Sequence, residues 1–158
     1  MSRCRLMALA LGLLVVNLAL CGDAADKEAE KLQGTWFAEK TVVGGKEQDK
    51  DAETVLVMRG ETVSWTYTRR MGDRAKSSSI SFTFKLDPKA KPPQIDLMAT
   101  EGTFAGKVFP SIYSLEGDTL KICRSQPGTK RPTEFVSKQG SDHWLLVLKK
   151  KPAPDEKK

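Results

Sequence analysis

The sequence predicts an all-β protein, an antiparallel barrel or sandwich, on the strength of three observations. Apolar and polar residues alternate with a period of two in several segments after residue 35. About nine such segments follow one another at short spacing, separated by turns rich in Gly, Asp and Pro. The clearest segments each carry one apolar face with several aromatic residues, and this favours a closed barrel with an apolar interior.

The size and charge of the chain limit the alternatives. It has 158 residues and a mass of 17.5 kDa, enough for one domain with a sizeable core. The net charge of +6 is mild and spread along the sequence, apart from the C-terminal tail. A nucleic-acid-binding protein would gather its positive charge on one face. We therefore expect no nucleic-acid partner. We also expect a monomer and no cofactor.

Residues 1–25 have the composition of an export signal. Arg3 and Arg5 precede an almost uninterrupted apolar run over residues 6–20, and Gly22-Asp23-Ala24 places small residues at a cleavage site. The run is shorter than the roughly 20 apolar residues that a membrane-spanning helix needs. The segment predicts export to the periplasm or the extracellular space.

Cys21 leaves two interpretations open. Leu18-Ala19-Leu20-Cys21 resembles a bacterial lipobox, in which Cys21 would carry a lipid anchor and tie the protein to a membrane. A small residue is usual where Leu20 stands, and the simpler interpretation is that Cys21 is discarded with the leader. Cys4 leaves with the leader in either case, so Cys123 has no intramolecular disulfide partner.

The mature chain begins with a short segment of helix formers. Residues 26–31 are polar and rich in Ala, Glu and Lys, and they predict about one and a half helical turns that end near Gly34. The alternative is a disordered N-terminus, since polar segments this short are often not helical alone. Residues 35–43 then form the first predicted strand.

Two neighbouring strands give the strongest structural signal. In residues 62–68, Val63, Trp65 and Tyr67 alternate with Ser and Thr, and residues 79–86 repeat the pattern. Short turns containing Gly, such as Gly60-Glu61, join strands into hairpins. The remaining strands are expected at residues 54–58, 95–99, 108–115, 119–124, 133–137 and 143–149. Residues 151–158 form a charged tail with two prolines, which we expect to be disordered.

Five sequence blocks, in this order, resemble a family of uncharacterised lipocalin-like domains common in planctomycete bacteria. The blocks are Leu32-Gln33-Gly34-Thr35-Trp36, Phe84-Lys85-Leu86-Asp87-Pro88, Ile112-Tyr113 with Gly117-Asp118-Thr119-Leu120-Lys121, Arg131-Pro132-Thr133-Glu134-Phe135, and Leu145-Leu146-Val147-Leu148-Lys149. The resemblance implies an antiparallel up-and-down lipocalin-like barrel of eight to nine strands with a short N-terminal helix, spanning residues 26–150. It implies export and no particular reaction.

The lipocalin resemblance also implies a structural role for Gly34 and Trp36. In lipocalins the tryptophan of the Gly-x-Trp signature plugs the closed end of the barrel, and an arginine of the last strand packs on it. The last strand here offers only Lys149 and Lys150. An arginine from elsewhere, such as Arg131 or Arg124, is then the candidate to stack on Trp36.

No residues form a recognisable catalytic or metal site. His143 is the only histidine, and no Cys/His spacing typical of a metal site occurs. The serines at residues 77–79 lack a nucleophile elbow, and no carboxylate pair can be assigned to acid–base work. We expect a protein that is not an enzyme.

The candidate ligand-binding residues are the aromatic side chains expected inside the barrel: Trp65, Tyr67, Phe82, Phe84 and Tyr113. They either line a pocket for a small apolar molecule or fill the core, as side chains do in many eight-stranded barrels. The first alternative predicts a carrier or sensor. The second predicts an interaction module without a ligand, acting through its loops or a basic hairpin tip.

Two further features complete the predictions. Arg69, Arg70, Arg74 and Lys76 flank the turn after residue 70, so that hairpin tip is either a solvated edge or a contact for an anionic surface. Cys123 shares a strand face with Thr119 and Lys121, which predicts a partly exposed thiol.

Overall fold

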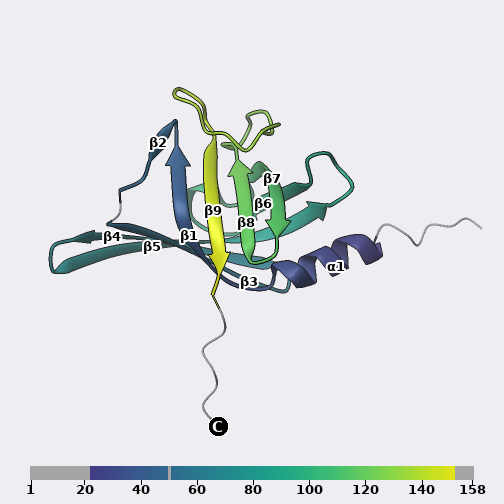
Figure 1. Ribbon diagram of the computed structural model, residues 1–158, viewed down its shortest axis with the longest axis horizontal. Helices are drawn as coiled ribbons and strands as arrows, with labels where there is room; N and C mark the ends of the chain where they lie inside the picture. The colour runs from purple at the N-terminus through teal and green to yellow at the C-terminus, as the bar shows by residue number, and fades with distance from the viewer. Residues whose placement is uncertain (1–21, 50, 152–158) are drawn as a thin grey trace, which may run out of the picture.

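One antiparallel sheet closes on itself because β1 pairs with both β3 and β9 (Figure 1). The computed structural model describes residues 22–49 and 51–151. Its elements are α1 (Gly22–Leu32), β1 (Gly34–Val43), β2 (Lys46–Glu47), β3 (Ala52–Arg59), β4 (Thr62–Met71), β5 (Arg74–Asp87), β6 (Gln94–Ala99), the 3₁₀ turn η1 (Gly102–Phe104), β7 (Val108–Glu116), β8 (Thr119–Arg124) and β9 (Trp144–Lys150). The predicted all-β, up-and-down, lipocalin-like barrel with a short N-terminal helix is confirmed.

The strand list differs from the prediction at two places. Residues 133–137 do not form a strand, and the short β2 pairs with the end of β1 instead. The segment after β8 cannot join the ladder because β8 pairs directly with β9. The closed barrel is therefore made of β1 and β3–β9, with β2 as an added edge.

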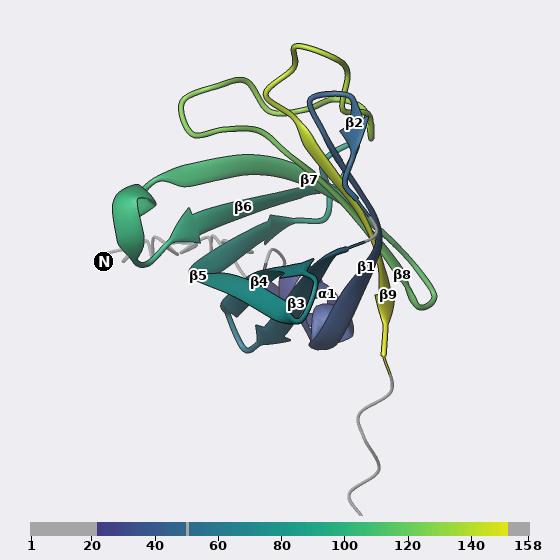
Figure 2. The ribbon, with the colours of Figure 1, turned by 90° about the vertical axis from the view of Figure 1, so that its left-hand side faces the viewer.

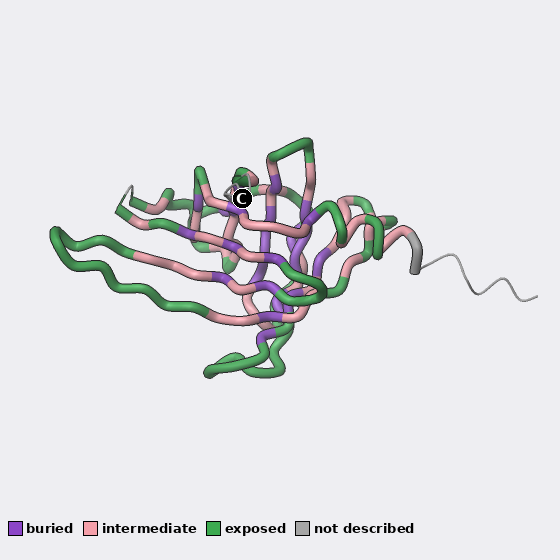
Figure 3. The backbone as a smooth tube through the Cα atoms, turned by 90° about the horizontal axis from the view of Figure 1, so that it is seen from below, coloured by how far each residue is buried: buried purple, intermediate pink, exposed green. Residues whose placement is uncertain are grey.

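Alternation along the strands builds the core. Val63 pairs with Phe82 and Trp65 with Ile80, so the apolar faces of β4 and β5 coincide. Buried residues gather in the middle of the sheet, while the far end of the β4–β5 hairpin is exposed (Figure 3). The buried apolar cluster also takes side chains from α1, β1, β3 and β6–β9.

The barrel is unequal at its two ends. The first four residues of β1 pair with β3, whereas the first three residues of β3 pair only with β4. β1 also carries an irregularity between Ala38 and Lys40 in its ladder with β9. β1 and β3 thus separate towards one end of the barrel, which we call the open end.

The opposite end, which we call the closed end, is where α1 leads into β1. The helix lies there beside the turn between β3 and β4, and Figure 2 shows the sheet curving over it. Gln33 fixes this arrangement, because its side chain accepts a hydrogen bond from Gly60 N at 2.7 Å and donates to Gly60 O at 3.1 Å. No helix in the described ranges is long and apolar enough to cross a membrane.

A long loop over residues 125–143 packs against the outside of the barrel. Cys123 Sγ donates to Val136 O at 3.7 Å, and Arg131 Nη1 donates to Ser111 O at 2.6 Å. The Cys123 side chain is consequently 0% exposed, and the expectation of a partly exposed thiol is wrong. The strand face was assigned correctly, but a loop without strand periodicity covers it.

The expected leader falls largely outside the described residues. Cys21 and residues 1–20 are not described, and Gly22 to Ala25 belong to α1. Of the tail, only Lys151 is described. Export, lipid attachment and tail disorder therefore stay predictions.

Candidate functional site: a pocket at the open end of the barrel

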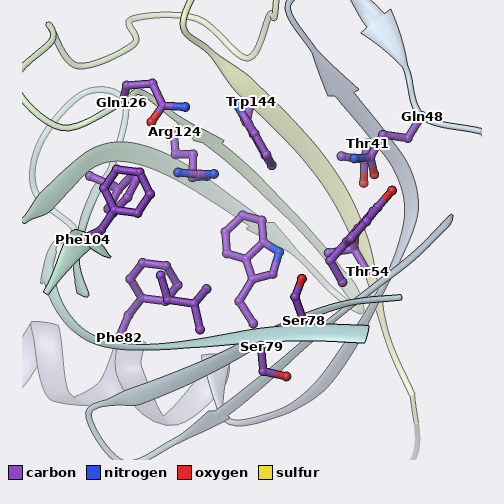
Figure 4. Close-up of a pocket in the computed structure, with 14 residues that line it drawn as sticks. Thr41, Gln48, Thr54, Ser78, Ser79, Phe82, Phe104, Arg124, Gln126 and Trp144 are labelled. Carbon is purple, nitrogen blue, oxygen red and sulfur yellow. The ribbon is translucent and has the colours of Figure 1, made fainter. Parts of the chain in front are cut away.

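A pocket of about 470 Å³ lies at the open end (Figure 4). It falls within the roughly 300–1,000 Å³ typical of small-molecule sites. Thr41 of β1 and Thr54 of β3 both line it, beyond the point where these two strands stop pairing. Its lining residues come from both walls of the barrel and from the loops: Thr41, Gln48, Thr54, Trp65, Tyr67, Ser78, Ser79, Ile80, Phe82, Phe104, Phe109, Arg124, Gln126 and Trp144.

Aromatic rings form a continuous wall on one side of this open-end pocket. The ring centroids of Trp65 and Phe82 are 6.2 Å apart, and those of Phe82 and Phe109 are 5.6 Å apart at an interplanar angle of 86°. Phe104, in η1, extends the wall to the rim, with its centroid 5.5 Å from that of Phe109. Tilted and edge-to-face pairs of this kind are favourable arrangements of aromatic rings. Most of the wall is buried, and Phe104 is 43% exposed at its edge.

Arg124 lies in the middle of the pocket, surrounded by aromatic rings. Its guanidinium carbon is 4.2 Å from the ring centroid of Trp144, 4.7 Å from that of Phe109 and 5.0 Å from that of Trp65. The side chain is only 8% exposed, and burial lowers its pKa to about 10. Figure 4 shows the guanidinium of Arg124 beside the Trp144 side chain.

The guanidinium has no hydrogen-bond acceptor among the described residues. Nε and Nη1 are buried and unpartnered, and Arg124 takes part in no ion pair in this part of the chain. Arg131, by contrast, donates to Asp96 Oδ1 at 2.6 Å. Buried polar groups are nearly always satisfied, so this unsatisfied guanidinium needs a physical explanation.

Neutral polar groups border the pocket on the side of β1 and β3. Thr41 and Thr54 are buried, at 7% and 3% exposure, and Gln48 lies beyond them near β2. Ser78 and Ser79 of β5, and Gln126 after β8, add neutral polar groups elsewhere in the lining (Figure 4). None of these side chains is charged, so Arg124 supplies the only formal charge in the lining.

Three of the five aromatic residues named from the sequence line the pocket, namely Trp65, Tyr67 and Phe82. The other two, Phe84 and Tyr113, do not. Phe84 lies near the closed end, where its backbone N–H donates to Glu61 O, and its ring packs against the core. The inward face was identified correctly, but one face serves a pocket at one end and a filled core at the other.

Tyr113 is a core residue with an unsatisfied hydroxyl. Its side chain is 1% exposed, and its Oη has no hydrogen-bond partner among the described residues. Burial raises the pKa of the Tyr113 phenol far above its usual range, and the carboxylates of Glu28 and Asp87 raise it further. The phenol stays neutral and does not contact the pocket.

Trp36 is fully buried at the closed end. Its Nε1 donates to Leu32 O at 2.8 Å, which ties the first strand to the end of α1. Lys150 Nζ lies 5.2 Å from the Trp36 ring centroid and donates to Lys31 O at 3.2 Å. The expectation that Arg131 or Arg124 stacks on Trp36 is wrong. A lysine of the last strand takes that place, because its flexible chain reaches both the ring and the helix terminus.

Gly34 has a backbone conformation that this junction requires. Its φ of +121° is one that residues with a side chain rarely adopt, and a Cβ there would lie 3.0 Å from Lys150 Cε. The glycine thus allows the helix to turn sharply into β1 beneath the Lys150 side chain.

Sequence reasoning did not assign four of the lining residues to the pocket: Arg124, Phe104, Phe109 and Trp144. Arg124 follows Leu120 and Ile122 at intervals of two, so its inward direction was available from the alternation. Phe104, Phe109 and Trp144 carried weaker signals, since they lie in a turn or at strand ends. Their convergence depends on barrel closure, which brings β7, β8 and β9 against β4 and β5.

The described residues contain no group of three or more His, Cys, Asp or Glu side chains that is arranged to hold a metal ion. His143 is only half-buried, and its backbone carbonyl accepts hydrogen bonds from Ser137 Oγ and Gly44 N.

Comparisons with models of protein families, with curated proteins and with solved structures give no match to this chain.

Proposed function

We propose that this protein binds a small, largely apolar molecule in the open-end pocket and does not catalyse a reaction. One observation supports the proposal above all: about 470 Å³ of space stands open beside an aromatic wall. Side chains that merely fill a core pack without voids larger than a water molecule. The pocket therefore favours a carrier or sensor over a filled barrel.

The size of the pocket limits the affinity we expect. A ligand that buries roughly 200–300 Å² of apolar surface gains about 5–8 kcal/mol at about 25 cal/mol/Å². Association costs several kcal/mol of lost translational and rotational freedom. We therefore expect dissociation constants no tighter than micromolar for a simple apolar ligand.

The alternative, an interaction module acting through the basic tip of the β4–β5 hairpin, has weaker support. Two of its four cationic side chains face carboxylates, with Arg69 Nη2 3.5 Å from Asp49 and Arg70 Nη2 3.8 Å from Glu53. Exposed pairs like these reduce the net positive charge of the tip. The tip is best understood as a solvated ribbon.

Titration with N-phenylnaphthylamine, a neutral apolar fluorophore, tests the binding proposal. We expect a saturable rise in fluorescence and an increase in the thermal midpoint. Trp65→Ala should weaken binding, since Trp65 forms part of the wall, and Arg70→Gln at the hairpin tip is the matched surface control. Absence of both a saturable signal and a thermal shift, with this probe and with a panel of long-chain acids and alcohols, would overturn the proposal.

We also propose that the chain is a lipocalin-like domain of the family named above, exported as a monomer. The intact mass of protein recovered from its host tests export. A chain that starts near Ala25 supports secretion, and one that starts at a lipid-modified Cys21 supports membrane anchoring. Retention of residues 1–20 would overturn both.

A further inference from the structure

Arg124 differs from the other arginines of the described chain in how its charge is satisfied. Arg69, Arg70 and Arg131 each face a carboxylate, and Arg59 and Arg74 are exposed to water. Arg124 is the only one of these six that is buried, yet it has neither a carboxylate nor any hydrogen-bond acceptor. The charge that is hardest to solvate is thus the one without an anion.

The three rings around the guanidinium compensate only partly for its missing hydrogen-bond acceptors. A cation beside an aromatic face is stabilised electrostatically, but the ring accepts no ordinary hydrogen bond. Arginine carries five N–H donors, and a buried donor without an acceptor destabilises the protein by its full desolvation cost. The deficit lies inside a pocket, so a bound molecule can remove it.

The accessible part of the guanidinium faces the pocket. Nε and Nη1 are enclosed, whereas Nη2 is not among the enclosed nitrogens, and Arg124 is itself a lining residue. An acceptor that enters the pocket therefore meets Nη2 first. A small shift of the side chain would then bring a second nitrogen into a two-point contact, which is the geometry that arginine favours with carboxylates.

From these observations we infer that the natural ligand is an amphipathic acid, with a monoanionic head group bound to Arg124 and an apolar body against Trp65, Phe82 and Phe109. This inference rests on the proposed binding function and adds the chemical class of its ligand. A neutral lipid would leave the guanidinium unsatisfied, and a cationic ligand would be repelled by it.

The lining also excludes multiply charged ligands. Arg124 is the only charged residue of the fourteen that line the pocket. The other polar groups are neutral hydroxyls and amides, which cannot offset a second negative charge in an apolar setting. A carboxylate or a sulfonate matches this single positive charge, whereas a nucleotide or polyphosphate does not.

Matched pairs of probes test the inference. N-phenylnaphthylamine and anilinonaphthalene sulfonate share one aromatic body, and only the second carries a charge. Decanoate and decanol form an aliphatic pair, used as competitors. We expect the anion of each pair to bind roughly 10- to 100-fold more tightly than its neutral counterpart, the range expected for a charge-assisted hydrogen bond.

Two substitutions of the same residue separate charge from shape. Arg124→Met leaves an unbranched side chain in place and removes its charge. It should abolish the preference for anions while neutral probes still bind. Arg124→Lys keeps the charge and should retain a reduced preference, since a lysine makes only a point contact. Arg74→Gln, at the exposed hairpin tip, is the control that removes one positive charge far from the pocket.

The outcomes distinguish this inference from the function on which it rests. Equal binding of anionic and neutral partners, unchanged in Arg124→Met, would overturn the acid assignment and leave the apolar-ligand proposal standing. An anion preference that is lost in Arg74→Gln as well as in Arg124→Met would also overturn it, because general charge attraction would then explain the result. Failure of all four probes to bind would overturn both.

Discussion

Both ends of this barrel place a cation over a tryptophan, but only one of the two cations has a hydrogen-bond acceptor. At the closed end, Lys150 lies over Trp36 and donates to Lys31 O in the last turn of α1. At the open end, Arg124 lies over Trp65 and Trp144 without a hydrogen bond to any described residue. Lys150 keeps contact with solvent, whereas Arg124 is buried.

The difference indicates which end is structural and which is free to bind. The Lys150 ammonium sits at the negative end of the helix dipole, where a cation is favourable. The Trp36 indole is also satisfied, through Leu32 O. The open end has equivalent aromatic contacts but no acceptor for its cation, and it has space beside it. The same pairing of cation and ring closes the barrel at one end and borders an open pocket at the other.

The largest expected effect comes from truncating the tryptophan of each end. Trp36→Ala should lower the free energy of unfolding by roughly 3–5 kcal/mol, because it leaves a cavity in filled space and removes the bond to Leu32 O. Trp65→Ala should cost less, since one side of that ring already borders the pocket. Denaturant unfolding of the two variants beside the parent protein measures the difference.

The binding data should show the opposite order. Trp65→Ala should weaken N-phenylnaphthylamine binding, while Trp36→Ala should leave it nearly unchanged under conditions where the variant is folded. Equal losses of stability in the two variants would show that the ends are packed alike, and the distinction between them would fail.

The fold was predictable because its signals are local. Alternation in β4 and β5 and the Gly-rich turns each depend on a few neighbouring residues, and so does the Gly34 junction. The loop over residues 125–143 was misjudged in part, since residues 133–137 have strand-like composition. Whether they join a ladder depends on β8 and β9 pairing directly, and that is a property of the whole sheet.

The pocket was less predictable for a related reason. Alternation shows that Phe82 and Phe84 face inward, and it cannot show that only Phe82 reaches open space. That outcome depends on where β1 and β3 separate. The unpaired state of Arg124 required knowing what lies around it from four other segments of the chain.

Cys123 can report how easily the open end comes apart. Burial raises the pKa of its thiol to about 11, and the loop over residues 125–143 encloses it, so the folded protein should react very slowly with iodoacetamide. If this loop opens locally, alkylation proceeds through a fluctuation that costs less free energy than global unfolding. From the labelling rate near pH 8, we expect an opening free energy that is smaller than the free energy of global unfolding.

An anionic ligand bound at Arg124 should slow this labelling, because it stabilises the strand that carries both residues.

The raised thiol pKa also has a direct consequence for stability. The unfolded thiol ionises near pH 9.0 and the folded one near 11, so stability should fall as the pH rises between these values. Cys123→Ala should lessen that fall. Labelling at the rate of global unfolding would contradict a locally weaker open end.

Removing the two cations should have opposite consequences. Lys150→Met should destabilise the protein by roughly 0.5–1 kcal/mol, the scale of an exposed cation–π contact. Arg124→Met should leave stability unchanged or raise it, because a buried charge without a partner is replaced by an apolar side chain. Thermal unfolding without ligand compares them, with Lys149→Met as the surface control. Destabilisation by Arg124→Met beyond that of Lys150→Met would assign Arg124 a structural role.

The smallest expected effect lies in the exposed side-chain pairs across the β4–β5 ribbon. Thr68 Oγ1 and Ser77 Oγ lie 2.8 Å apart across the two strands, and Thr66 and Ser79 repeat the contact at 2.8 Å. Such exposed cross-strand pairs contribute roughly 0.2–1 kcal/mol. A double-mutant cycle with Thr68→Val and Ser77→Ala should therefore give a coupling energy in this range. Because neither residue belongs to the buried cluster, the closed end should not respond, and iodoacetamide labelling of Cys123 should keep its rate. A coupling energy well above this range, or faster labelling, would show that the ribbon supports the barrel itself, and the open end would then be part of the same cooperative unit as the closed one.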